Sequence, residues 1–166
     1  MERERNSQKA KFWAAQNVLE PLARTFKTDK SLATFTRKAR TRAYLVKRHR
    51  RELSYSYRVT ALGSEARGTA YEINIPTTMR TDLMVARCLA RLIFNRTRVA
   101  DIAAFHGWEY CGIFLDVVHA LMGKNAGALL KASYQAKGVR FKPKKVVKVT
   151  PEMLERLALA RAKRVS

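Results

Sequence analysis

The side chains that can bind a metal ion are few and scattered along the chain. Cys88, His106, Cys111 and His119 supply the sulfur and imidazole ligands that tetrahedral zinc prefers. Their spacings match no zinc-finger or zinc-knuckle pattern, so a zinc site built from these four residues is the weaker interpretation. In the stronger one, both cysteines are small buried apolar residues and His106 makes a hydrogen bond. We therefore expect neither a metal ion nor any other cofactor.

Two arginines in an apolar segment have the spacing of an anion site. Arg87 and Arg91 are four residues apart, so they lie on one face of a helix. In a concave site, two guanidinium groups can hold a phosphate through bidentate hydrogen bonds. Alternatively they pair with Asp101 or Glu109 and only fill space, and we prefer this interpretation. The side of the helix opposite its core face is expected to carry Arg80, Leu83, Arg87, Arg91 and Phe94.

A larger concentration of positive charge lies in an expected helix over residues 31–50. We predict nucleic-acid contacts along one stripe and at its carboxyl end, at Arg37, Arg40, Tyr44, Lys47, Arg48 and Arg51. Neighbouring like charges repel unless a polyanion neutralises them, and Tyr44 can stack on a base or a sugar. The alternative is a solvated basic face, whose cations also complement the helix dipole.

A second basic segment lies further along the chain. Its predicted phosphate contacts are Arg140, Lys142, Lys144, Lys145 and Lys148. Pro143 interrupts the segment and favours an extended arm, which contacts phosphates without reading bases.

The composition points to a polyanionic partner. The 166 residues include 34 Lys and Arg against 13 Asp and Glu, giving a formal charge of +21 and a pI near 10.7. Such an excess is the electrostatic footprint of a nucleic-acid-binding protein. A hydrophobic content of 47% is enough for one core, and two cysteines are too few for a disulfide framework. With no leader-like or membrane-spanning stretch, we expect a cytoplasmic protein without membrane contact.

Apolar periodicity predicts the elements that position these residues. Helices are expected over residues 8–26 with a kink or restart at Pro21, then over 31–50, 77–94, 108–122, 125–137 and 150–164. Ser31 is the expected N-cap of the second helix, and Thr77 or Thr78 that of the third. Residues 52–62 and 69–75 alternate as strands and are expected to pair antiparallel. Helices around a small sheet make an α+β fold.

Three blocks resemble a family of metallohydrolases from actinobacteria and their phages, distantly similar to SprT-like zincins. They are RNSQKAKFWAA at 5–15, RTDLMVARCLARLI at 80–93, and HGWEYCGIFLDVVHALMG at 106–123 followed by AKGVRF at 136–141. In such zincins the middle block carries H-E-x-x-H, which binds zinc and activates its water. Here that register reads Arg87-Cys88-x-x-Arg91, and only His106 matches a ligand position. Guanidinium has no lone pair for a cation, so the resemblance implies the fold of the family without its activity.

Together these patterns predict a single α+β domain, zincin-like but degenerate over residues 1–142, with a basic arm and C-terminal helix at 143–166. The expected function is non-catalytic binding of DNA or RNA, in a pseudoenzyme that the resemblance implies is phage-encoded. An alternative is a protein that docks on a host nucleic-acid machine such as the ribosome or RNA polymerase. A third, less favoured, interpretation is a hydrolase with unconventional ligands.

Overall fold

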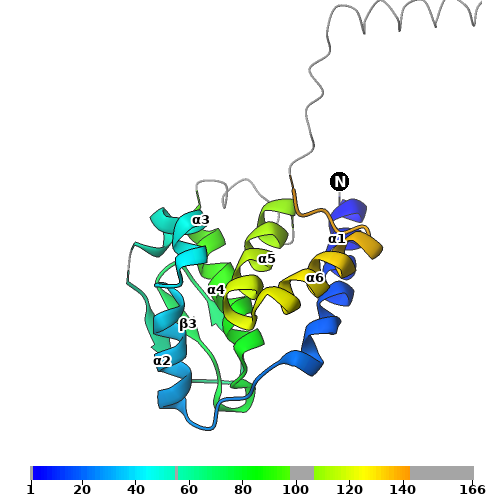
Figure 1. Cartoon of the computed structure of the whole chain (residues 1–166). Coiled ribbons are helices and arrows are strands. Elements are labelled where there is room, and N and C mark those ends of the chain that lie inside the picture. The colour runs from blue at the N-terminus through cyan, green and yellow to red at the C-terminus, as the bar shows by residue number, and fades with distance from the viewer. Residues whose placement is uncertain (1, 55, 98–106, 143–166) are drawn as a thin grey trace, which may run out of the picture.

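The computed structural model describes residues 2–54, 56–97 and 107–142 (Figure 1). The helices are α1 (Glu2–Gln16), α2 (Asp29–Ala39), α3 (Ala43–Leu53), α4 (Asp82–Arg96), α5 (Trp108–Met122) and α6 (Lys124–Ala136). Two 3-10 helices, η1 (Asn17–Leu22) and η2 (Thr77–Met79), and three short strands, β1 (Arg58–Thr60), β2 (Arg67–Gly68) and β3 (Glu72–Asn74), complete the described part. The expected α+β class is therefore confirmed. The helix expected over residues 150–164 lies outside the described residues.

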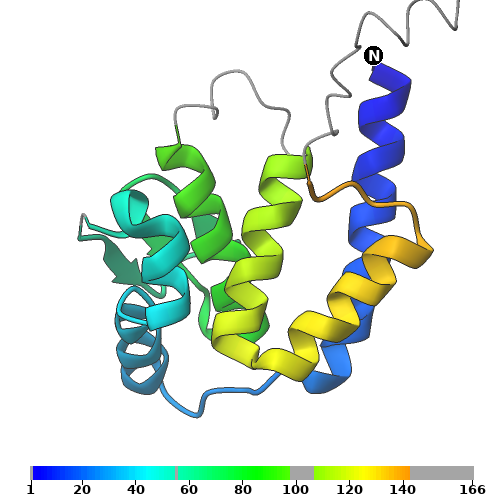
Figure 2. The ribbon, with the colours of Figure 1, turned by 45° about the horizontal axis from the view of Figure 1, so that its top comes forward.

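Helices α4 and α5 form the centre of the molecule (Figure 2). Helix α6 folds back against α5 and α1, while α3 and the sheet pack on the other side. The expected core residues Val85, Leu89 and Leu92 are buried, as predicted. Leu83 and Phe94 are buried as well, so the side of α4 that they share with Arg87 and Arg91 is also packed against protein. Helix α4 packs on the sheet and on α5 at once and buries most of its circumference.

The first expected helix changes type before its proline. Helix α1 ends at Gln16, and the chain continues as the 3-10 helix η1, which contains Pro21. Proline lacks the N–H that an α-helix would use, so a tighter turn near Pro21 fits the predicted interruption.

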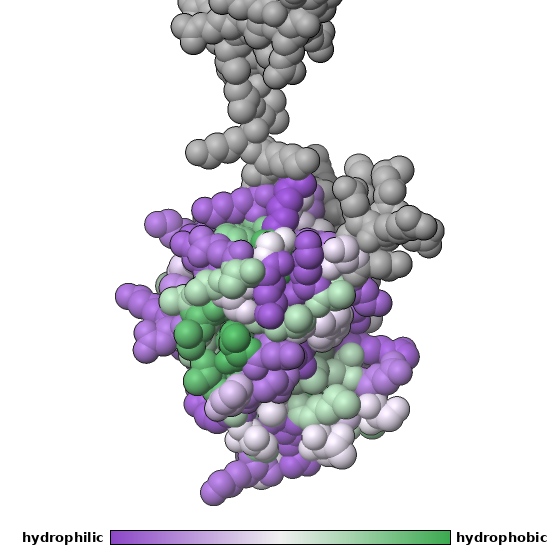
Figure 3. Space-filling view, turned by 90° about the vertical axis from the view of Figure 1, so that its right-hand side faces the viewer, coloured by the Kyte–Doolittle hydropathy of each residue, from purple (hydrophilic) through white to green (hydrophobic). Residues whose placement is uncertain are grey.

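The surface on the side of the molecule where α1 and α6 lie is mostly hydrophilic, with a smaller apolar area (Figure 3).

The single helix expected over residues 31–50 is two helices, so that prediction was wrong. Helix α2 ends at Ala39, and Arg42 is extended (φ −61°, ψ 119°) before α3 begins. The break has a packing reason, because Ala39 and Leu45 are both buried yet lie on different sides of any continuous helix. The predicted stripe from Arg37 to Arg51 is consequently divided between two helices.

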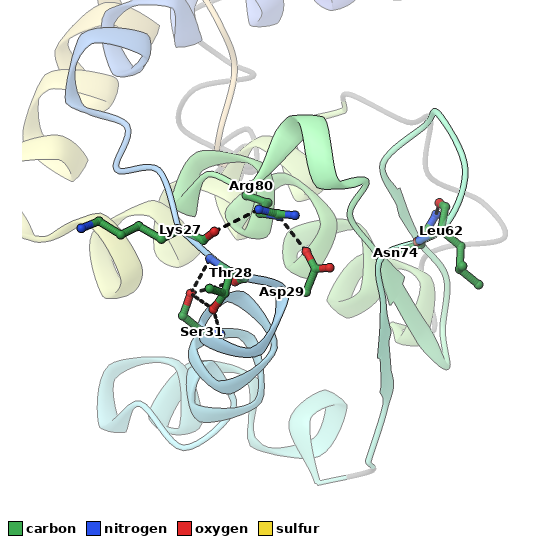
Figure 4. A network of polar contacts seen from close by, with 7 residues as sticks. All are labelled: Lys27, Thr28, Asp29, Ser31, Leu62, Asn74 and Arg80. Atoms are coloured by element: carbon green, nitrogen blue, oxygen red, sulfur yellow. Dashed lines mark hydrogen bonds and ion pairs between the residues drawn. The ribbon is translucent and has the colours of Figure 1, made fainter.

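Helix α2 begins one turn earlier than predicted, with Thr28 as the N-cap (Figure 4). Ser31 is the other half of a capping box, in which the Thr28 hydroxyl accepts the Ser31 N–H at 3.2 Å. Arg80 was expected on the same side of the helix as Arg87 and Arg91, but it lies before α4 begins. Its guanidinium pairs with Asp29 at 2.7 Å and donates to the Lys27 carbonyl at 3.1 Å, which ties the start of α2 to the turn before α4.

The sheet has the order β1-β3-β2. Strand β1 pairs parallel with β3, so the predicted antiparallel pairing of these two segments was wrong. The loop between them contains β2, which pairs antiparallel with β3. A short strand within the connection lets the chain return to β3 in the same direction as β1. Residues 52 and 53, expected to begin the strand, instead end α3.

The helix expected over residues 77–94 begins later than predicted, at Asp82. Residues Thr77–Met79 form η2, and α4 is capped by Thr81, whose hydroxyl accepts the Met84 N–H. Helices α5 and α6 match their predicted ranges to within one residue, and Gly123 separates them with φ 99°. A positive φ of this size favours glycine and stops the helix.

Candidate nucleic-acid interface

A cleft of about 490 Å³ lies between α3, α5 and α6. Four cationic side chains line it, and we call it the basic cleft: Arg48, Lys124, Lys131 and Lys142. Among the described lining residues Asp116 is the one carboxylate. Four cations against one carboxylate leave an excess of positive charge at a concave surface, which is the arrangement that attracts phosphate.

Small residues bring the walls of the basic cleft together. A Cβ atom at Gly127 would lie 3.0 Å from the Cβ of His119, so glycine there allows α6 to approach α5 closely. At Gly112, a Cβ atom would lie 3.0 Å from the carbonyl oxygen of Phe141. The chain after α6 therefore crosses directly over α5, which places Lys142 at the cleft.

The turn after α6 fixes this crossing. Gly138 has φ 63°, and the Val139 N–H then donates to the Tyr134 carbonyl at 2.8 Å. The Phe141 ring lies 5.5 Å from the ring of Tyr134, which is fully buried. Buried aromatic packing thus holds the last described residues of the chain beside the basic cleft.

Tyr44 and His119 stack at one end of the basic cleft, with ring centroids 4.2 Å apart and planes inclined by 20°. The Arg48 guanidinium lies 4.7 Å from the centroid of the Tyr44 ring. Tyr44 is half-buried by these contacts and does not stand in an exposed row of cations as predicted. Its ring packs on protein partners, so it positions Arg48 instead of presenting an open face to a base.

Asp116 connects this cluster. Its carboxylate accepts the Tyr44 hydroxyl at 3.3 Å and lies 3.1 Å from His49 Nε2 and 3.5 Å from the Arg48 guanidinium. Burial raises the pKa of the Tyr44 hydroxyl, the charge of Asp116 raises it further, and Arg48 partly offsets both. Tyr44 is therefore a neutral hydrogen-bond donor at neutral pH.

The structure brings only part of the predicted contact set together. Tyr44, Arg48 and Lys142 meet at the basic cleft, although they come from two separate basic segments. Arg37 and Arg40 line a different hollow of about 410 Å³ between α2 and the chain before β1. The remaining predicted contacts are Lys47, Arg51 and Arg140, which are exposed but do not line the cleft, and Lys144, Lys145 and Lys148, which lie outside the described residues.

The cleft also contains two lysines that sequence reasoning missed. Lys124 and Lys131 are seven residues apart on α6, with Ala128 between them, so all three occupy one face of the helix. That spacing could have predicted that the two lysines share one face of a helix. What the sequence did not provide was the packing of α6 against α5, which turns this face toward α3.

The Arg87-Cys88-x-x-Arg91 register lies on the opposite side of α5, against α1 and β2. Arg87 donates from Nε to the Gln16 side chain at 2.8 Å and pairs with Glu20 at 2.8 Å. Arg87 is thus paired, as the preferred interpretation expected, but its described partners come from α1 and η1 and not from Glu109. The alternative partner Asp101 and the ligand-position residue His106 lie outside the described residues.

Cys88 is buried beside the two arginines. Burial raises the pKa of its thiol to about 12, although Arg91 and Arg87 both act to lower it. The thiol is therefore protonated at neutral pH and is a poor nucleophile. Among the described residues, no group of three or more His, Cys, Asp or Glu side chains is placed to hold a metal ion.

No described helix combines the length and the apolar character needed to cross a lipid bilayer. Comparisons with protein-family models, with curated proteins and with solved structures find no match for this chain.

Proposed function

We propose that this protein binds nucleic acid without catalysing a reaction and that its main phosphate contact is the basic cleft. The observation that carries the proposal is the convergence of Arg48, Lys124, Lys131 and Lys142 around one concavity, from α3, from α6 and from the chain that follows it. The formal charge of +21 supports it, because a polyanion relieves the self-repulsion of so basic a chain.

The chemistry of the basic cleft favours phosphate contact over base reading. Lysine and arginine side chains neutralise phosphates and release condensed counterions, whatever the base sequence. The ring of Tyr44 already packs on His119 and Arg48, so it offers a base little stacking surface. We therefore infer binding that depends strongly on salt and weakly on sequence.

The proposed lack of catalysis rests on the arginine register and on its resemblance to the zincin motif. Arg87 and Arg91 carry no lone pair that could bind a cation, and Cys88 stands where the motif has its carboxylate base. The neutral, buried thiol of Cys88 supports the same view. In this proposal the chain keeps a zincin-like framework, as the resemblance implies, and binds nucleic acid through its basic surface.

The test is the salt dependence of binding to a short DNA duplex and to a structured RNA. For the wild-type protein we expect a log-log slope of several units, since each neutralised phosphate contributes about −0.9 on B-DNA. Replacing all four cleft cations by glutamine should reduce the slope by up to about 3 to 4 units on the duplex.

A matched control removes four exposed cations elsewhere, at Lys9, Lys11, Lys30 and Arg58, and changes the net charge equally. We expect the control to lose much less affinity than the cleft variant. Equal losses would show that net charge alone drives binding. Absence of binding at low salt would remove nucleic acid as the direct ligand and favour docking on a protein of a nucleic-acid machine.

A further inference from the structure

A second pocket, of about 520 Å³, lies between α1, α4 and the chain around β2. It shares no lining residue with the basic cleft, so it is a separate site. We call it the arginine pocket, and its lining includes Trp13, Ala66, Met84, Arg87 and Arg91. Nothing in the proposed nucleic-acid contact uses these residues.

The arginine pocket presents two guanidinium groups at one concave surface. Arg87 and Arg91 line it, and the one carboxylate in its described lining is Glu65. Glu65 is 72% exposed and pairs with Arg67 at 3.2 Å, so its charge lies at the rim and is largely neutralised. Glu20 pairs with Arg87 at 2.8 Å and offsets its charge. The pocket therefore offers an anion guanidinium N–H donors from two arginines, without a large excess of positive charge.

Arg87 is held in place before any ligand arrives. It donates to Gln16 and pairs with Glu20, and its guanidinium lies 5.5 Å from the centroid of the Trp13 ring. A guanidinium has about five N–H donors, and these contacts use two of them among the described residues. A fixed cation with remaining donors loses little side-chain freedom when it binds an oxyanion.

The other walls of the pocket are apolar. Trp13 and Met79 are partly exposed at its edge, and Ala66, Met84 and Tyr110 line it further. An inorganic anion would leave these surfaces in contact with water. A ligand that carries both an oxyanion and an apolar body would cover them and gain from their burial.

We propose that the arginine pocket binds a small organic oxyanion, with its carboxylate or phosphate on Arg87 and Arg91 and its apolar body against Trp13 and Met84. The site binds without reacting, because Cys88, the one thiol in its described lining, is buried and its rim carboxylate is already paired. The proposal is independent of nucleic-acid binding.

The experiment uses phenyl phosphate and phenylacetate as probes and the fluorescence of Trp13 as the signal. The chain has two tryptophans, so the measurement is made in a Trp108→Phe background. We expect saturable binding of at least one of the two anions, which also identifies the preferred headgroup. Benzyl alcohol, which lacks the charge, and inorganic phosphate, which lacks the apolar body, should each bind at least tenfold more weakly.

Two variants separate the site from its alternatives. Arg91→Met should weaken binding of the preferred probe at least tenfold, and Ala66→Phe, which fills the pocket without changing charge, should do the same. The variant without the four cleft cations should bind as the wild type does, and circular dichroism checks that each variant is folded. The proposal fails if neither anion binds saturably, if inorganic phosphate binds as tightly as the organic probes, or if folded Arg91→Met retains wild-type affinity.

Discussion

Replacing Asp116 by asparagine tests the electrostatics of the basic cleft, because asparagine has nearly the same shape but carries no charge. The Asp116 carboxylate lies 3.5 Å from the Arg48 guanidinium and so opposes any phosphate that Arg48 holds. Adding a hydrogen-bond length to that distance places the phosphate roughly 6 Å from the carboxylate. At this separation the repulsion is about 0.7 kcal/mol with the dielectric constant of water and about 2.8 kcal/mol with an effective value near 20.

The lower part of this range applies, because Arg48 is 52% exposed and the cleft is open to solvent. Asp116→Asn should therefore tighten binding of a short DNA duplex about threefold to tenfold at low salt, as measured by fluorescence anisotropy. The asparagine oxygen can still accept the Tyr44 hydroxyl, so we expect the local fold to persist.

Glu65→Gln is the matched control, since it makes the same charge change outside the basic cleft. We expect it to alter affinity less than twofold. Unchanged or weaker binding by a folded Asp116→Asn protein would refute the electrostatic account of the cleft. An equal gain from Glu65→Gln would show that net charge, and not position, sets the affinity.

Two further predictions concern the framework. A Cβ atom at Gly68 would lie 2.1 Å from the Cys88 carbonyl oxygen, so Gly68→Ala must separate β2 from α4 and should cost about 3 kcal/mol in urea unfolding; Gly63→Ala, where nothing lies within 4 Å, should cost only about 1 kcal/mol for its positive φ. Burial raises the thiol pKa of both Cys88 and Cys111 from 9.0 to about 12. At a pH between 9.0 and about 12, the unfolded chain therefore holds fewer protons than the folded one. The free energy of unfolding should then fall as pH rises above 9, by about 1.4 kcal/mol per pH unit for each thiol. Replacing both cysteines by alanine should make the fall shallower, and an unchanged slope would contradict the assigned thiol pKa values.

The helices with strong local signals were predicted well from the sequence. Helix α5 has a continuous apolar pattern, and Gly123 supplies a stop that needs no tertiary information. The division between α2 and α3 was not predicted, because the local pattern is continuous from Leu32 to Val46. The burial of Leu45, a long-range packing effect, decides where the helix breaks.

Strand direction was also beyond the sequence pattern. Alternation at the two segments predicts strands but not whether they run parallel, and β2, at only two residues, is too short to give a signal of its own. The same limit applies to the site. Basic residues were easy to find, yet only tertiary packing reveals that Lys124, Lys131 and Lys142 face Arg48 across one cleft.

The most direct test of the central claim is to map the nucleic-acid contact by NMR, titrating isotope-labelled protein with a short DNA duplex at low salt. We predict that the largest amide and side-chain shifts fall on Arg48, His119, Lys124 and Lys131, with small shifts at Arg37 and Arg40. Added salt should reverse the shifts, as expected for phosphate contact. Shifts centred on α2 or on the arginine pocket, with the basic cleft unchanged, would contradict the proposed interface.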